Sequence, residues 1–163
     1  MLINTARRLA AAAVLVVVAA PVAQAQTASQ TVTFAVNAIN QIAFAGAPSL
    51  TITTATAGSA PTSVTDAVTA TWAVTTNQTG AKITASIPAM PAGLTLSASL
   101  AAPAAATSAG FLALSATAVD LVTGITKLAQ GALGVSYKLD ATPAAGVVTS
   151  ATRLVTYTIT GGT

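Results

Sequence analysis

Short segments in which apolar residues alternate with Thr, Ser or Ala recur along most of the chain. Successive side chains of a strand point to opposite faces of a sheet, so a period of two predicts strands with one buried face. Gly, Pro and Asn residues separate the segments, as is typical of turns, and no long helical period follows the first 25 residues. The pattern predicts strands at residues 31–44, 49–54, 68–75, 82–87, 94–100, 111–119, 133–139 and 153–160.

Many short strands between turn signals are typical of an antiparallel β-sandwich. Pro-containing breaks of unequal length favour two sheets joined by crossing connections over a closed barrel. Residues 120–130 are ambiguous, because their apolar spacing fits either a helical turn or a crossover. We expect an all-β fold, an immunoglobulin-like β-sandwich of about seven to nine antiparallel strands.

The first 25 residues have the features of a secretory signal peptide. Arg7 and Arg8 precede an apolar run at residues 9–20, and Ala23 and Ala25 form a small-x-small cleavage site. An uncleaved anchor is the alternative, but the run is shorter than the ~20 residues of a membrane-spanning helix. We expect residues 26–163 to be exported as a single domain, secreted or held at the cell surface.

The net charge of +3 includes Arg7 and Arg8, so residues 26–163 carry four basic against three acidic side chains, 4 − 3 = +1. No basic stripe is present for a phosphate backbone, and we expect no nucleic acid partner. Only 6% of the residues are charged, whereas protein surfaces usually have roughly 25–35%. A surface of this kind suits a protein that lies against neighbours, although hydroxyl groups alone can also keep a sandwich in solution.

Side chains for catalysis are scarce. The chain has no His and no Cys, and its only acidic residues are Asp66, Asp120 and Asp140. Most enzyme mechanisms need a positioned acid, base, nucleophile or metal ligand, and no D-x-D-x-D run is present to supply oxygen ligands for calcium. We expect no enzymatic activity, no cofactor and no metal site.

Trp72, the only tryptophan, lies between the apolar alternates of its predicted strand. This position favours a buried indole, whereas a sugar-binding platform would need an exposed one. Asn77-Gln78-Thr79 matches a glycosylation sequon, which is a weak signal. The residues that we predict to form the core are Trp72, Val74, Leu94, Leu96, Val135, Tyr137, Val155 and Tyr157.

The first predicted strand, residues 31–44, is longer than the usual ~5–6 residues. It is either the first strand of its own sandwich or, within a longer N-terminal stretch at residues 27–46, a strand that pairs with a neighbouring subunit by β-strand addition. In the second case its alternate apolar side chains enter the neighbour. The predicted interface residues of this donor strand are Val32, Phe34, Val36, Ile42 and Phe44.

The segments TVTFAVNAINQIAFAG, SVTDAVTATWAVTTNQTGAKITASI, PAGLTLSASLAAP and TRLVTYTIT resemble a group of small secreted bacterial β-sandwich proteins. This group is similar in style to pilin-like and spore-coat-U-like surface subunits. The resemblance implies an extracellular assembly protein with an immunoglobulin-like fold. The chain departs from usher-type pilins because it has no cysteine for their disulfide.

We therefore expect a structural subunit of an extracellular fibre, pilus-like filament or surface coat, assembled by β-strand addition from copies of itself. The alternative is a soluble secreted binding module for a carbohydrate or a protein. No membrane span is expected once the signal peptide is removed, and a cell-surface anchor stays an open alternative.

Overall fold

The computed structural model describes residues 24–163, and of residues 67–69 only the backbone. The predicted signal peptide, residues 1–25, therefore lies almost entirely outside the described residues. The chain divides into two units, residues 1–35 and 36–163. Residues 24–35, the described part of the first unit, form no helix or strand, and their side chains are exposed.

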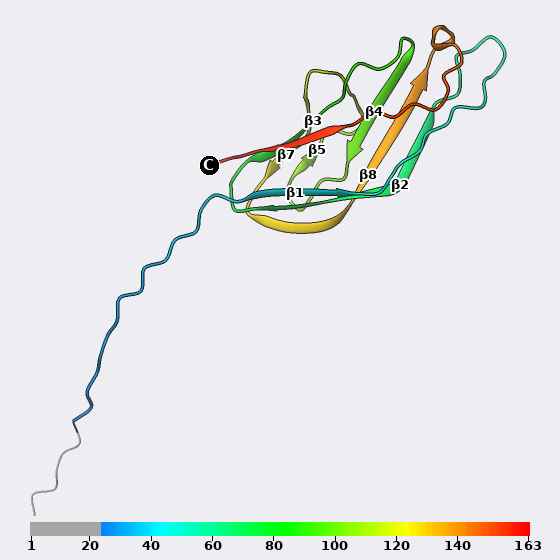
Figure 1. Ribbon diagram of the computed structural model, residues 1–163. Helices are drawn as coiled ribbons and strands as arrows, with labels where there is room; N and C mark the ends of the chain where they lie inside the picture. Colours follow the sequence, from blue (N-terminus) through cyan, green and yellow to red (C-terminus); the bar gives the residue numbers. More distant parts are fainter. Residues whose placement is uncertain (1–23) are drawn as a thin grey trace, which may run out of the picture. The chain divides into compact units, whose positions relative to one another are not determined.

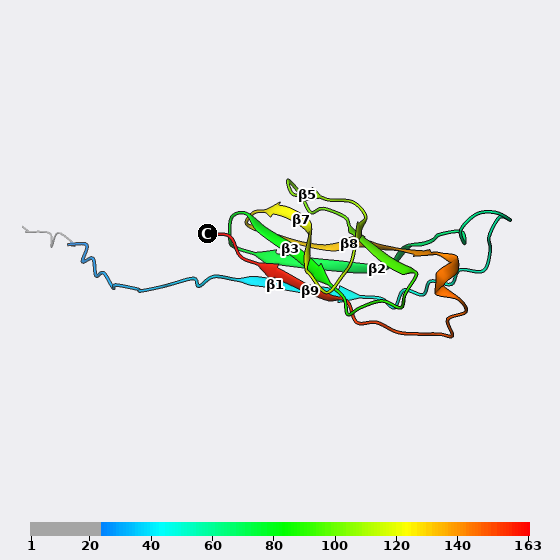
Figure 2. The same cartoon turned by 90° about the horizontal axis from the view of Figure 1, so that it is seen from above.

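The second unit contains two antiparallel sheets, which confirms the all-β sandwich (Figures 1 and 2). The five-stranded sheet has the order β1 (Asn40–Ala45), β2 (Val64–Thr76), β8 (Leu128–Ala141), β4 (Leu94–Leu100) and β6 (Leu112–Ala113). The four-stranded sheet has the order β5 (Thr107–Ser108), β7 (Val119–Ile125), β3 (Ala81–Ser86) and β9 (Thr156–Thr160). A single 3₁₀ turn, η1 (Pro143–Ala145), follows β8 within the described residues.

The apolar faces of the two sheets form the core. Alternation along β3 is strict, since every second residue from Ala81 to Ala85 is completely buried. Trp72 on β2 is 1% exposed, and its indole Nε1–H donates a hydrogen bond to the Ala101 carbonyl oxygen over 3.2 Å. This bond satisfies the polar group of the largest core side chain.

Four predicted strands are shorter in the structure or absent from it, because a strand needs a neighbour. The predicted strand at residues 111–119 is reduced to β6 at Leu112–Ala113 and the first residue of β7. β1 begins only at Asn40, which pairs with Thr76 at the end of β2, so residues 31–39 have no strand beside them. Residues 49–54 keep an alternating pattern of exposure, yet they form no strand. β9 similarly begins at Thr156, three residues after the predicted start.

The ambiguous stretch at residues 120–130 contains most of β7 and the start of β8. It forms no helical turn, and the crossover is confirmed, because the chain passes at residues 126–127 from the four-stranded sheet to the five-stranded sheet. The register between β3 and β7 shifts twice, around Ile83, and Leu121 and Val122 are both completely buried. Bulges of this kind interrupt the alternation, which explains why the period of two fails to identify this strand.

The two sheets also differ in length. β2 and β8 have 13 and 14 residues, whereas β3, β7 and β9 have six, seven and five. At about 3.3 Å per residue, the long strands exceed the short ones by roughly 20 Å. One part of the inner face of the five-stranded sheet therefore has no strand opposite it, and this part contains the candidate site.

Candidate functional site

The inner face of the five-stranded sheet becomes less covered toward one end of the sandwich. Leu100 of β4 pairs with Val135 of β8, and these residues are 0% and 1% exposed. Four residues further along both strands, Leu96 pairs with Leu139, and both are only half-buried. The side chains on this face are still apolar at Leu96 and Leu139, but they are less well covered than Leu100 and Val135.

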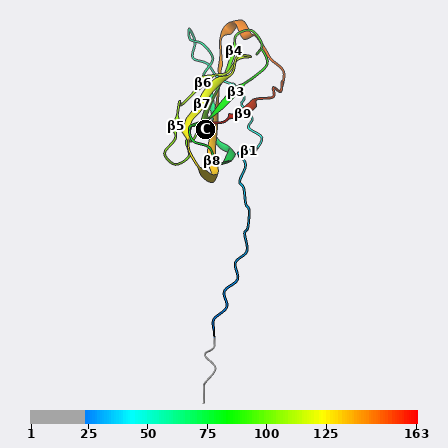
Figure 3. The ribbon, with the colours of Figure 1, turned by 90° about the vertical axis from the view of Figure 1, so that its left-hand side faces the viewer.

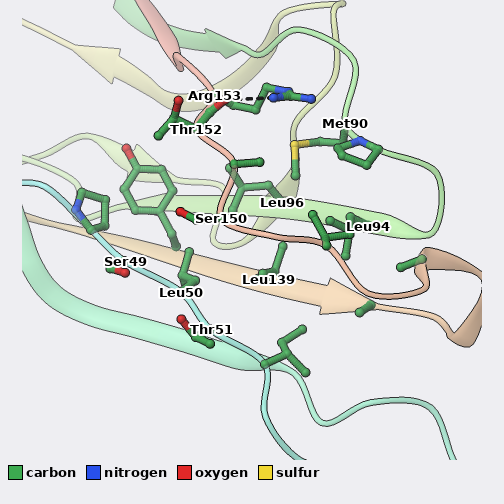
Figure 4. Close-up of a pocket in the computed structure, with 18 of the residues that line it drawn as sticks. Ser49, Leu50, Thr51, Met90, Leu94, Leu96, Leu139, Ser150, Thr152 and Arg153 are labelled. Carbon is green, nitrogen blue, oxygen red and sulfur yellow. Dashed lines mark hydrogen bonds between the residues drawn. The ribbon is translucent and has the colours of Figure 1, made fainter.

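A groove of about 1030 Å³, whose lining is polar and apolar in nearly equal parts, lies over this part of the sheet. Its floor includes Leu94, Leu96 and Leu139 (Figure 4). Residues 46–55, which follow β1, form the first wall, and residues 146–155, which precede β9, form the second wall. The volume is at the upper end of the roughly 300–1,000 Å³ that is typical of small-molecule pockets.

Most of the backbone in both walls has no strand partner; the exception is the end of the first wall, where Ala55 forms an isolated bridge with Pro61. Among the described residues, 47–53 and 147–154 make no backbone–backbone hydrogen bond. Leu50 and Ile52 of the first wall are half-buried and alternate with exposed Ser49, Thr51 and Thr53. The first wall therefore presents apolar side chains on one side and has unused backbone donors and acceptors along its length.

The rim of the groove combines hydroxyl side chains with exposed apolar ones. Val148 and Leu154 of the second wall are 42% and 77% exposed. Arg153 is the one charged residue among the described residues that line the groove, and its guanidinium donates to the carbonyl oxygens of Ala89 and Thr152. The remaining surface is suited to an uncharged partner that has both apolar and polar groups.

Aromatic side chains close the inner end of the groove. The hydroxyl oxygens of Tyr137 and Tyr157 lie 2.6 Å apart, and the Tyr157 ring stacks on Phe44 with 3.9 Å between ring centroids. Phe44 in turn stacks on Trp72 at 6.0 Å. Burial raises the pKa of both tyrosine hydroxyls. The stack joins β1 to β9, the edge strands on the same side of the two sheets (Figures 2 and 3).

The five predicted donor-strand residues lie in two environments. Val32, Phe34 and Val36 are 72%, 88% and 78% exposed and belong to no strand. Ile42 and Phe44 lie in β1, pair with Val74 and Trp72 of the same chain, and pack against its core. Ile42 and Phe44 therefore belong to a strand of their own sandwich. Only Val32, Phe34 and Val36 remain candidates for pairing with a neighbouring subunit.

Asn77 marks the boundary between these parts. Its Oδ1 accepts a hydrogen bond from the Ile39 N–H over 2.8 Å, and its Nδ2 donates to the Asn37 carbonyl oxygen over 2.7 Å. The side-chain amide thus holds the chain in place at Ile39 and Asn37, beyond the last strand pair of β1 with β2. We call these contacts the Asn77 clamp. The predicted sequon residue has both polar atoms of its side chain engaged in it.

The predicted core residues also divide by position. Trp72, Val74, Val135 and Tyr137 are 1%, 2%, 1% and 8% exposed. Leu94, Leu96, Val155 and Tyr157 are half-buried and line the groove. The groove does not follow from the sequence pattern, although the strand pattern of residues 49–54, which form no strand, is a signal for it.

The acidic residues form no common site. Asp120 pairs with Lys82 at 3.0 Å and Asp140 pairs with Lys138 at 3.1 Å, and all four side chains are partly exposed. The Ser63 hydroxyl donates to Asp140 and holds the pKa of that carboxyl below its usual value. Within residues 24–163, no group of three or more His, Cys, Asp or Glu side chains could hold a metal ion.

Comparison with protein-family models, with curated proteins and with solved structures gives no match. None of the helical structure in residues 24–163 is long and apolar enough to cross a membrane.

Proposed function

We propose that the exported chain is a structural subunit of an extracellular fibre, pilus-like filament or surface coat. In this proposal, the N-terminal segment of one copy adds as a strand to the next copy. The observation that carries it is the exposure of Val32, Phe34 and Val36 at alternate positions of a segment that has no strand partner. Such a segment contributes backbone hydrogen bonds along its length and places alternate side chains in pockets of a neighbour.

Two further features support assembly from copies of the chain. A head-to-tail contact, in which one surface of a subunit meets a different surface of the next, produces an open filament when it does not close into a ring. The charged residues that usually protect exposed strand edges are absent from β1 and β9, which have the sequences NQIAFA and TYTIT.

The groove also supports a second candidate, a soluble secreted module that binds an apolar ligand or peptide. Its volume of about 1030 Å³ and its paired tyrosine hydroxyls are compatible with such a ligand. A carbohydrate platform has less support, because Trp72 is 1% exposed.

The test is to delete residues 27–38 from the exported chain. These residues precede β1 and belong to no strand, so the domain is expected to keep its fold, as circular dichroism would check. The deletion variant is expected to stay monomeric in light scattering while the full exported chain forms filaments under the electron microscope. A free peptide of residues 27–38 is expected to block growth. A full chain that stays monomeric at high concentration would contradict the proposal.

Export itself is tested by mass spectrometry of secreted material. We expect the protein to begin at or near Gln26, because Ala23 and Ala25 supply the small residues of the cleavage site. Recovery of chains that still contain Arg7 and Arg8 would contradict this expectation.

A further inference from the structure

We propose that the groove receives residues 31–38 of a second copy, which pair as a strand with residues 49–54 of its first wall. This inference rests on the proposed function and identifies the surface that accepts the added strand.

The first argument is that the chain contains two segments with a strand pattern and no strand partner. Residues 31–38 alternate Thr, Ala and Asn with Val and Phe, and residues 49–54 alternate Ser and Thr with Leu and Ile. Neither segment forms a strand. Removing an unpaired backbone group from water costs free energy. Pairing the two segments gives partners to the backbone groups that have none; the Asn37 and Thr54 carbonyl oxygens already accept hydrogen bonds from Asn77 Nδ2 and the Thr62 N–H.

The second argument is the match between the side chains and the groove. At about 3.3 Å per residue, Val32 and Val36 lie roughly 13 Å apart on one face of an extended strand, with Phe34 between them. Beside the first wall, this face points in the same direction as Leu50 and Ile52, toward Leu96 and Leu139 on the floor. The incoming strand thus provides the apolar cover that these floor residues lack.

The third argument concerns charge. Residues 26–39 contain no charged side chain, so their entry buries no charge from the donor. The Arg153 guanidinium of the second wall already donates to two backbone carbonyl oxygens. Burying an unpaired charge is costly, and neither partner requires it here.

The fourth argument favours a second copy over the same chain. The Asn77 clamp holds residues 37–39 at the start of β1, whereas the groove begins at Phe44, near the other end of this strand, and extends away from the clamp along residues 46–55. To enter the groove of its own chain, the segment would have to reverse at the residues that Asn77 holds. Entry into a neighbour does not require this reversal.

The experiment uses disulfide formation, because the chain has no cysteine of its own. Directly opposite residues of paired strands have Cβ atoms about 4.5–5.5 Å apart, close enough for a disulfide after small adjustments. Full exported chains carrying Phe34→Cys are mixed with isotope-labelled chains carrying Leu50→Cys or Ile52→Cys, under a mild thiol oxidant. The control chain carries Thr158→Cys, at an exposed position of β9 on the other sheet.

We expect one of the two wall variants to link to Phe34→Cys at least tenfold more than the control variant does. Equal yields for wall and control, or no wall link in material that forms filaments, would overturn the proposal. A chain that carries both substitutions and forms the link as a dilute monomer would also overturn it, because the segment would then enter its own groove.

A second measurement separates this inference from the proposed function. Leu50→Arg places a charge in the groove, and Ala43→Arg places the same charge at an exposed position of β1 that does not line the groove. We expect Leu50→Arg to reduce filament growth at least tenfold, while residues 31–38 of this variant still bind wild-type chains. We expect Ala43→Arg to leave filament growth unchanged. If Leu50→Arg forms filaments normally while the deletion of residues 27–38 does not, the groove assignment fails and the proposed function stands. If the deletion variant also forms filaments, both fail.

Discussion

The inner face of the five-stranded sheet has two halves that are similar in composition and different in environment. Around Trp72, Val135 and Leu100 the four-stranded sheet covers the face, and these side chains are at most 1% exposed. Around Leu96 of β4 and Leu139 of β8 the side chains are equally apolar, yet only the two groove walls lie over them. The alternation of residues determines which face of a strand is apolar, whereas the length of the opposite strands determines whether that face is covered.

The largest effect on stability is expected at the centre of the covered half. Trp72→Ala removes a side chain that is 1% exposed and should lower the free energy of unfolding by about 3–5 kcal/mol. Urea denaturation measures the loss, and tryptophan emission of the unchanged protein should be blue-shifted in the folded state. An exposed emission spectrum, together with unchanged stability of the variant, would contradict the burial of this residue.

A smaller loss is expected in the open half. Leu139→Ala should cost about 1–2 kcal/mol in the monomer, below the 2–5 kcal/mol of a completely buried leucine, because Leu139 is only half-buried. Leu100→Ala, on the covered half, is the matched comparison. Equal losses at the two positions would mean that the walls cover the sheet as well as strands do.

The Asn77 clamp should contribute still less. Asn77→Ala removes two hydrogen bonds to the backbone at residues 37 and 39, and a net loss of about 1 kcal/mol is expected for partly exposed bonds. Amide hydrogen exchange at Ile39 should accelerate while exchange in β3 stays unchanged. Asn77→Asp, which keeps the acceptor for the Ile39 N–H, should have an intermediate effect.

The smallest effect at neutral pH concerns the tyrosine pair at the inner end of the groove. Burial raises the pKa of Tyr137 and Tyr157 above the ordinary value of 10.0, so the folded state keeps these protons at pH values where the unfolded state loses them. The contribution of the tyrosine pair to stability should therefore be constant from neutral pH to about pH 10 and fall as the pH rises further. Denaturation at pH 8 and pH 11 measures this fall, and Tyr157→Phe should reduce it.

Much of the fold could be predicted from the sequence, because alternation reports burial directly. Residues 82–87 and 94–100 were predicted as strands, and β3 and β4 occupy nearly the same ranges. β7 could not be identified in this way, since bulges place Leu121 and Val122 on the same buried side. The pattern of residues 49–54 correctly predicts which side chains are half-buried, but these residues form no strand. Strand formation also requires a partner from elsewhere in the chain, which a local pattern does not report.

Of the proposed contact, only the donor segment could be predicted from the sequence, and the groove could not. Exposed alternate residues at Val32, Phe34 and Val36 follow from a local pattern, which the sequence analysis used. The groove arises from the unequal lengths of strands far apart in the sequence, β2 and β8 against β3, β7 and β9. No local pattern encodes such a difference.

The register of β1 against β2 has a mechanical consequence. Six consecutive residues, from Asn40 to Ala45, pair with Thr76 to Thr71 in antiparallel order. A tensile force applied to the chain before Asn40, along the strand axis, loads this ladder in shear, so that its hydrogen bonds must break together rather than one after another. The Asn77 clamp yields first under such a load, and the β1 ladder bears the tension that follows.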